Sequence, residues 1–267
     1  MKSENLSLAN YIDALQTRGQ YVFYRQKALE ALGFSENAFK KAVMRLTQKG
    51  RVRRVRGDFY IIVPLEYQTM GNLPATWFID EFMRSLSAPY YVGILSAAAL
   101  HGAAHQQPMV FQVVTNHLYK PIRIGRLRLE FHYKKVIDPS FYRPIKTETG
   151  TMQVATPEMA ACDVVRYINA AGQIHNAATL LTELSEKIDM KILNDYVTKG
   201  WIEVSVVQRL GYLLEFLEYQ ESLDDLSAWV KIHQPHYRLL VKGQTAPILE
   251  RNKRWLILVN EKVETDL

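Results

Sequence analysis

The sequence has a single cysteine, Cys162, and no long uninterrupted apolar run. One cysteine excludes an intrachain disulfide and a zinc site made of several thiolates, and it fits a reducing compartment. No stretch reaches the roughly 18 apolar residues that a membrane-spanning helix needs, and the first residues form no apolar segment of the signal-peptide type. We therefore expect a soluble, cytoplasmic protein that does not bind a membrane.

The chain also lacks the glycine-rich loops that hold nucleotide phosphates, since neither G-x-x-x-x-G-K-[ST] nor G-x-G-x-x-G occurs. His101 and His105 have the spacing of a helical metal pair, but Gly102 lies between them and the glutamate of the zinc-protease motif is missing. Cys162 lies in an amphipathic pattern and is expected in the core. We expect no metal, no cofactor and no catalytic residue.

Positive charge is concentrated near the amino terminus. The 267 residues carry a net charge of +6, and residues 1–70 hold 12 Lys and Arg against 6 Asp and Glu, which accounts for all of it. The length favours two domains. A basic segment joined to a neutral remainder suggests a nucleic-acid module followed by a second domain.

The stretch from Ser35 to Val63 is typical of a helix followed directly by a β-hairpin. Ser35 suits the N-cap, and Lys49 with Gly50 suits the helix end. Gly57 and Asp58 predict the hairpin turn, and Pro64 ends the second strand. The apolar stripe of the predicted helix consists of Phe39, Ala42, Val43 and Leu46.

Upstream of it, the patterns predict a helix over 7–18, a short strand over 21–23 and a second helix over 25–32. The full order is that of a winged helix-turn-helix, in which one helix enters the major groove of DNA and the hairpin, called the wing, lies along the backbone or the minor groove. We expect residues 1–66 to form this DNA-binding domain.

The predicted helix and wing are strongly basic. Eight Lys and Arg residues and no acid lie between Lys40 and Arg56, which is a dense cationic footprint for a polyanion. Asn37, Lys41 and Gln48 are the candidates for contacts with base edges. The predicted DNA-binding residues are Ser35, Asn37, Lys40, Lys41, Arg45, Gln48, Arg51, Arg53, Arg54 and Arg56.

Residues 67–267 are predicted to form a larger α+β domain with a mostly antiparallel sheet and flanking helices. The apolar run at 255–259 is expected to return to that sheet as a strand. The other predicted strands cover 109–115, 122–133 with a turn or bulge at Gly125, and a hairpin within 141–156. The predicted helices cover 77–85, 90–102, 157–168, 176–188, 189–199, 203–219 and 222–233.

A second basic stripe falls on the predicted ribbon at 122–133 and its flanks. Glu130 is the only acid within it. It is either a solvated surface with local salt bridges or a surface for nucleic acid or an acidic partner. Its members are Lys120, Arg123, Arg126, Arg128, Lys134 and Lys135.

Four stretches of the chain form one recognisable set: GRVRRVRG at 50–57 with Tyr60, YVGILSAAALHG at 91–102, VATPEMAACDVV at 154–165 and QRLGYLLE at 208–215. The middle two, taken in this order, are the more distinctive. Together the four stretches resemble the AbiEi antitoxins of type IV toxin–antitoxin, or abortive infection, systems.

The resemblance implies a winged helix that represses the antitoxin's own operon, with inverted repeats as the DNA target, and a second domain that carries antitoxicity and assists repression. It also implies a nucleotidyltransferase-like toxin encoded alongside, whose action is opposed without a stable complex. By the same resemblance, the basic residues of the predicted helix and wing contact DNA.

Two other functions fit the residues. The same winged helix could be joined to a domain that senses a small ligand. The ribbon could instead belong to a metal-dependent nuclease with Glu130 and Lys134, although no acid precedes it on a neighbouring strand. We expect a transcriptional repressor acting as an antitoxin, not an enzyme.

Overall fold

The computed structural model describes residues 7–103, 110–233, 236–243 and 246–265. Helices and strands are mixed along the chain, which confirms the predicted α+β class. The chain divides into two compact units, each described by itself: the first holds residues 1–91, 109–137 and 144–153, and the second holds 92–108, 138–143 and 154–267. The predicted domain boundary after residue 66 stays a prediction.

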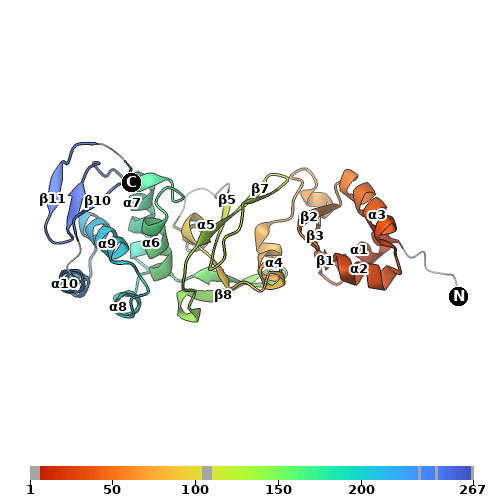
Figure 1. Cartoon of the computed structure of the whole chain (residues 1–267), viewed down its shortest axis with the longest axis horizontal. Coiled ribbons are helices and arrows are strands. Elements are labelled where there is room, and N and C mark those ends of the chain that lie inside the picture. The colour runs from red at the N-terminus through yellow and green to blue at the C-terminus, as the bar shows by residue number, and fades with distance from the viewer. Residues whose placement is uncertain (1–6, 104–109, 234–235, 244–245, 266–267) are drawn as a thin grey trace. The chain divides into compact units, whose positions relative to one another are not determined.

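The amino-terminal elements of the first unit follow the predicted order. Three helices and three short strands share one core, and the strands form a sheet in the order β1-β3-β2 (Figure 1). The elements are α1 (Leu8–Gln16), β1 (Val22–Tyr24), α2 (Arg25–Leu32), α3 (Glu36–Gln48), β2 (Val52–Arg56) and β3 (Phe59–Ile62).

Helix α3 forms where the local signals predict it. The Ser35 hydroxyl accepts a hydrogen bond from the Ala38 amide at 3.3 Å, which satisfies one free donor of the first turn. Gly50 follows the helix with a φ of 73°, a conformation that glycine adopts without a steric cost. Phe39 and Leu46 are buried in the shared core, so burial of this apolar stripe holds the helix in place.

The β2–β3 hairpin closes on a two-residue turn. Arg56 pairs with Phe59, and Gly57 has a φ of 55°, which is the position where a type II′ turn places glycine. The register shifts between Arg54 and Arg56, so a bulge re-aims the arginines at the tip.

The main sheet has six strands in the order β6-β7-β5-β4-β9-β8. Two of its pairings, β5 with β7 and β4 with β9, are parallel, while β6 and β7 are antiparallel. The sheet is therefore more mixed than predicted. Its strands are β4 (Tyr90–Val92), β5 (Val110–Thr115), β6 (Ile122–Ile124), β7 (Leu127–Tyr133), β8 (Tyr142–Thr147) and β9 (Gly150–Ala155).

The predicted helix over 90–102 is wrong in its first part. Residues 90–92 form strand β4, and the helix α5 (Ile94–Leu100) begins only after Gly93. Tyr90, Tyr91 and Val92 are all buried, and aromatic and β-branched side chains suit a strand inside a sheet. The predicted helix over 77–85 consists of a 3₁₀ turn (Ala75–Trp77) followed by α4 (Ile79–Ser85), and 3₁₀ turns also occur at Leu65–Tyr67 and Pro139–Phe141.

The second unit is mainly helical. Its helices after α5 are α6 (Pro157–Arg166), α7 (Gln173–Ser185), α8 (Met190–Thr198), α9 (Val204–Phe216) and α10 (Asp224–Ile232). Cys162 is a buried free thiol in α6. Within the described residues, no helix is long and apolar enough to cross a membrane.

The apolar run at 255–259 does not return to the main sheet, which corrects that expectation. It contributes β12 (Ile257–Val259) to a separate small sheet with β10 (Arg238–Leu239) and β11 (Glu250–Asn252). The pairing is parallel to β10 and antiparallel to β11. The partners of β12 are thus the short strands β10 and β11, whose sequences do not show the alternation or apolar run that predicts a strand.

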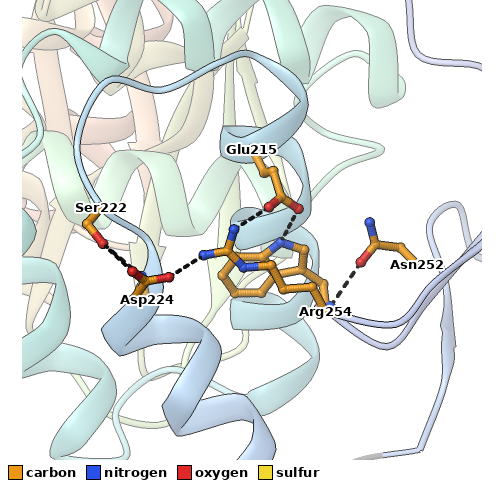
Figure 2. A network of polar contacts seen from close by, with 6 residues as sticks. Glu215, Ser222, Asp224, Asn252 and Arg254 are labelled. Carbon is orange, nitrogen blue, oxygen red and sulfur yellow. Dashed lines mark hydrogen bonds and ion pairs between the residues drawn. The ribbon is translucent and has the colours of Figure 1, made fainter.

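A polar network fixes the start of β12 against α9 (Figure 2). Arg254 bridges Glu215 and Asp224, and the Trp255 indole donates to Glu215 at 2.7 Å. The Asn252 side chain accepts a hydrogen bond from the Trp255 amide at 3.0 Å. The indole is fully buried and lies directly against Gly211 of α9, so this glycine makes room for the ring.

We expect Gly211→Ala to destabilise the protein by about 1–3 kcal/mol, because overpacking a filled core has this cost. A Cβ atom at Gly211 would lie 2.1 Å from the Trp255 ring. Helix propensity alone would instead favour alanine by about 1 kcal/mol. Urea unfolding measures the sign of the change in unfolding free energy. Thr198→Ala, at the exposed end of α8, is the control. A stabilised Gly211→Ala variant would show that the ring moves aside.

Candidate nucleic-acid interface

The outward face of α3 carries five of the residues predicted to meet DNA. Phe39, Ala42 and Leu46 are buried beneath the helix. These five residues, all exposed, are Asn37, Lys40, Lys41, Arg45 and Gln48, and the exposed Met44 lies among them. Lys40, Lys41 and Arg45 have neither a hydrogen bond nor an ion pair from their side chains within the described part of the chain. Their charges are therefore not neutralised by neighbouring acids.

Ser35 differs from these residues because its hydroxyl already caps α3. It is exposed, and a hydroxyl that accepts one bond can still donate another. Ser35 lies at the helix N-terminus, where the dipole favours a negative group such as a phosphate. Its placement is thus compatible with the predicted contact.

Two wing arginines bind the protein itself. Arg51 forms an ion pair with Asp13 of α1 and also approaches Gln16 at 3.4 Å. Arg53 donates to the Thr47 carbonyl at 2.7 Å, which lies in the last turn of α3, where free carbonyls accept cations. Both side chains are only partly exposed, so they tie the hairpin to the helices.

The other two wing arginines are exposed. Arg54 donates from Nε to the Gly57 carbonyl at 2.6 Å, which holds it along the hairpin tip. The guanidinium of Arg56 lies 5.1 Å from the ring centre of Tyr119, a cation–π geometry that leaves its nitrogens able to donate. Neither has a carboxylate partner within the described residues, so both can approach a phosphate.

Sequence reasoning missed Arg25, which links the two parts of the predicted interface. Its guanidinium lies 3.1 Å from Glu36 at the start of α3 and 3.1 Å from Asp58 in the wing turn. It neutralises the acids closest to the basic face. No periodicity marks it, because its partners lie 11 and 33 residues along the chain.

The second basic stripe forms a surface on β6 and β7, with one correction. Arg123 and Arg128 pair directly across the two strands, and both are exposed. Lys120, Arg126 and Lys135 are also exposed. Lys134 is only 3% exposed and does not belong to this surface. It directly follows the end of β7, where its main-chain amide donates to the Thr115 carbonyl of β5 at 2.9 Å.

Part of the charge on this surface is compensated. Arg128 forms an ion pair with Glu130 at 2.6 Å, and His132 lies 3.8 Å from the same carboxylate. Burial lowers the pKa of His132, while Glu130 acts in the opposite direction. Lys120, Arg123 and Arg126 remain without a side-chain partner in the described residues.

A close main-chain contact places the β6–β7 turn beside the wing. The Arg126 amide donates to the Met70 carbonyl at 3.1 Å and to the Asn72 side chain at 3.2 Å. Gly125 lies against Gly71, where a Cβ atom would come within 2.5 Å of the Gly71 carbonyl oxygen. Gly71 in turn lies close to Arg53. Both basic sets therefore belong to the first unit.

Only one member of the histidine pair, His101, lies among the described residues. His101 Nε2 lies 2.7 Å from the Ala155 carbonyl, and His105 lies outside the described residues. Among the residues described, no group of three or more His, Cys, Asp or Glu side chains could hold a metal ion.

Comparisons with known proteins point to one family. Residues 91–216 match the family model described as the AbiEi antitoxin C-terminal domain. A crystal structure of the RV2827C protein from Mycobacterium tuberculosis has a similar fold, with a TM-score of 0.65 and 12% sequence identity over 93% of this chain and 89% of that chain. The search of curated proteins gives no match.

We expect Gly125→Ala to destabilise the protein by at least about 1 kcal/mol more than Gly57→Ala. Both glycines have a positive φ, 57° and 55°, so both substitutions carry a similar backbone cost. Only Gly125 faces a neighbouring main chain, whereas Gly57 has nothing within 4 Å of an added Cβ. The difference between the two losses of unfolding free energy, measured with denaturant, gives the cost of the close contact at Gly125. Equal losses in the two variants would contradict this explanation.

Proposed function

We propose that this chain, which belongs to the AbiEi antitoxin family through residues 91–216, is a DNA-binding repressor of its own operon. Residues 7–63 supply the proposed winged helix, with α3 in the major groove and the β2–β3 wing along the backbone. The role needs no catalysis, cofactor or metal. The DNA partner is a duplex operator, and inverted repeats would suit a pair of bound copies.

The family match supports the antitoxin role, and an antitoxin implies a toxin partner. We propose that this toxin is a nucleotidyltransferase-like protein and that the antitoxin opposes its action without a stable complex. Repression and antitoxicity then belong to different surfaces. Variants of α3 should lose repression and still rescue cells that express the toxin.

One observation carries the DNA-binding proposal: the cations of α3 are exposed and unpaired. Lys41 and Arg45 lie away from Phe39 and Leu46, and Lys40 lies at the edge of the same exposed face. None of the three forms an ion pair within the described residues, since Glu36 is paired with Arg25. Three cations without ion-pair partners make no favourable electrostatic contribution to the stability of the fold. A phosphate backbone would supply the missing charge, with release of its condensed counterions.

We expect Lys41→Ala with Arg45→Ala to lower the slope of log K against log salt by about two units, about 0.9 for each lost phosphate contact. Fluorescence anisotropy with a duplex from the region upstream of the gene, over a salt series, measures the slope. Arg51 and Arg53 are unsuitable for this test because they also hold the wing to the helices.

Lys231→Ala with Lys146→Ala is the matched control, because it removes two exposed lysines from α10 and β8 and changes the net charge equally. The control should keep the original slope. If both double variants change the slope equally, overall charge controls binding and the proposed interface is wrong.

The second basic surface takes either DNA phosphates or an acidic partner, and one double variant separates the two. We expect Lys120→Ala with Arg123→Ala to lower the salt slope by up to about two units if DNA extends over this surface. An unchanged slope together with lost rescue from the toxin would assign the surface to antitoxicity. Unchanged slope and unchanged rescue would leave it as a solvated face.

A further inference from the structure

A hollow in the second unit gathers positive charge that the proposed repressor function does not use. It is lined by residues from the end of α6, the first turns of α9 and the segment after β10, and its volume is about 230 Å³. Arg166, Arg209 and Lys242 line it, with Glu203 as the only acid. All these residues belong to one compact unit.

Among the residues that the structure describes, Arg209 is a buried cation without a carboxylate partner. Only 5% of it is exposed, and its guanidinium donates to the main-chain carbonyls of Ser205, Leu239 and Leu240 at 2.8–3.1 Å. Burial lowers its pKa, and Arg238 lowers it further. Carbonyl groups fix the position of the guanidinium but do not neutralise its charge, so a buried counter-ion would be favourable here.

The N-terminus of α9 opens onto the same hollow. The Glu203 carbonyl already accepts from Val206 and Val207, and no side chain caps the helix. The amides of Val204 and Ser205 therefore find no acceptor within the described residues. Unpaired amides at the positive end of a helix favour an anion.

Arg166 and Lys242 complete the surroundings. Arg166 is mostly buried and is paired with two acids: Glu203, and Asp163 at 4.0 Å from its Nε atom. Lys242 is exposed and has no side-chain partner within the described chain. Acids thus neutralise Arg166, whereas Arg209 and Lys242 have no acidic partner within the described residues. The Glu203 carboxylate at the same hollow opposes the binding of an anion.

We propose that this hollow binds the phosphate group of a small anion, either free phosphate or a phosphomonoester. A compact group with several acceptor oxygens can meet the α9 amides and the Lys242 ammonium together, beside the buried charge of Arg209. The volume admits a phosphate with a small attached group. This site is independent of DNA binding, because it uses none of the residues of α3 or the wing.

Isothermal titration calorimetry at constant ionic strength tests the proposal with two probes, inorganic phosphate and adenosine monophosphate. Equal affinity for both identifies the phosphate group alone, and tighter binding of the nucleotide identifies a phosphomonoester. Both results support the site. No binding of either probe at about 10 mM, where a site with a Kd of 1 mM would be about nine-tenths occupied, would overturn it.

Three variants locate the binding. Lys242→Ala should weaken it about tenfold, the effect of losing one charge-assisted contact, and Lys231→Ala on α10 should leave it unchanged. Glu203→Gln should strengthen it several-fold, because the competing carboxylate is removed while the side-chain size is kept. An unaffected Lys242→Ala, or a Glu203→Gln variant that binds no more tightly, would contradict the assignment. Lys242→Ala should bind operator DNA with the original salt slope, which separates this result from that of the repressor proposal.

Discussion

Contacts among three aromatic rings fix α3 to the sheet, and the proposed interface depends on them. Phe23 of β1 stacks on Tyr60 of β3 with ring centres 5.2 Å apart, and Phe39 of α3 meets Tyr60 edge-on at 5.8 Å. Such pairs contribute beyond the area that they bury. Because Phe39 points into this cluster, the 3.6-residue period turns Lys41 and Arg45 outward. The position of the cations thus follows from the packing of the core.

The basic face of α3 was predictable from sequence, because helical periodicity separates buried from exposed positions without knowledge of distant residues. The fate of individual arginines was not. Arg51 meets an acid 38 residues away in the chain, and Arg53 folds onto the Thr47 carbonyl. Lys134 lies within a basic stripe but is buried. Charge counts locate a cationic region, whereas ion pairs and burial depend on tertiary contacts that charge counts do not contain.

The fold, too, has parts that the local sequence predicts and parts that it does not. The elements from 7 to 63 follow local signals such as caps, glycine turns and amphipathic stripes, and their bounds were predicted within a few residues. Strand β4 was predicted as helix because its apolar run adjoins the alanine-rich α5, and a short buried run has no period of its own. The partners of β12 and the parallel pairing of β5 with β7 are long-range choices. Local pattern specifies an element, but competition among many possible strands decides its neighbour.

The cations of α3 and the hollow lined by Arg209 would bind anions in different ways. The α3 cations are exposed to solvent, so salt screens each of them beyond about 8 Å at physiological ionic strength. Affinity for DNA must then come from many simultaneous phosphate contacts. Arg209 is buried and held by carbonyls before any ligand arrives, so little ordering remains to be done on binding. An anion bound only by the folded second unit would also stabilise that unit by mass action. Binding at α3 should therefore depend chiefly on ionic strength, whereas binding beside Arg209 should be coupled to folding of the second unit.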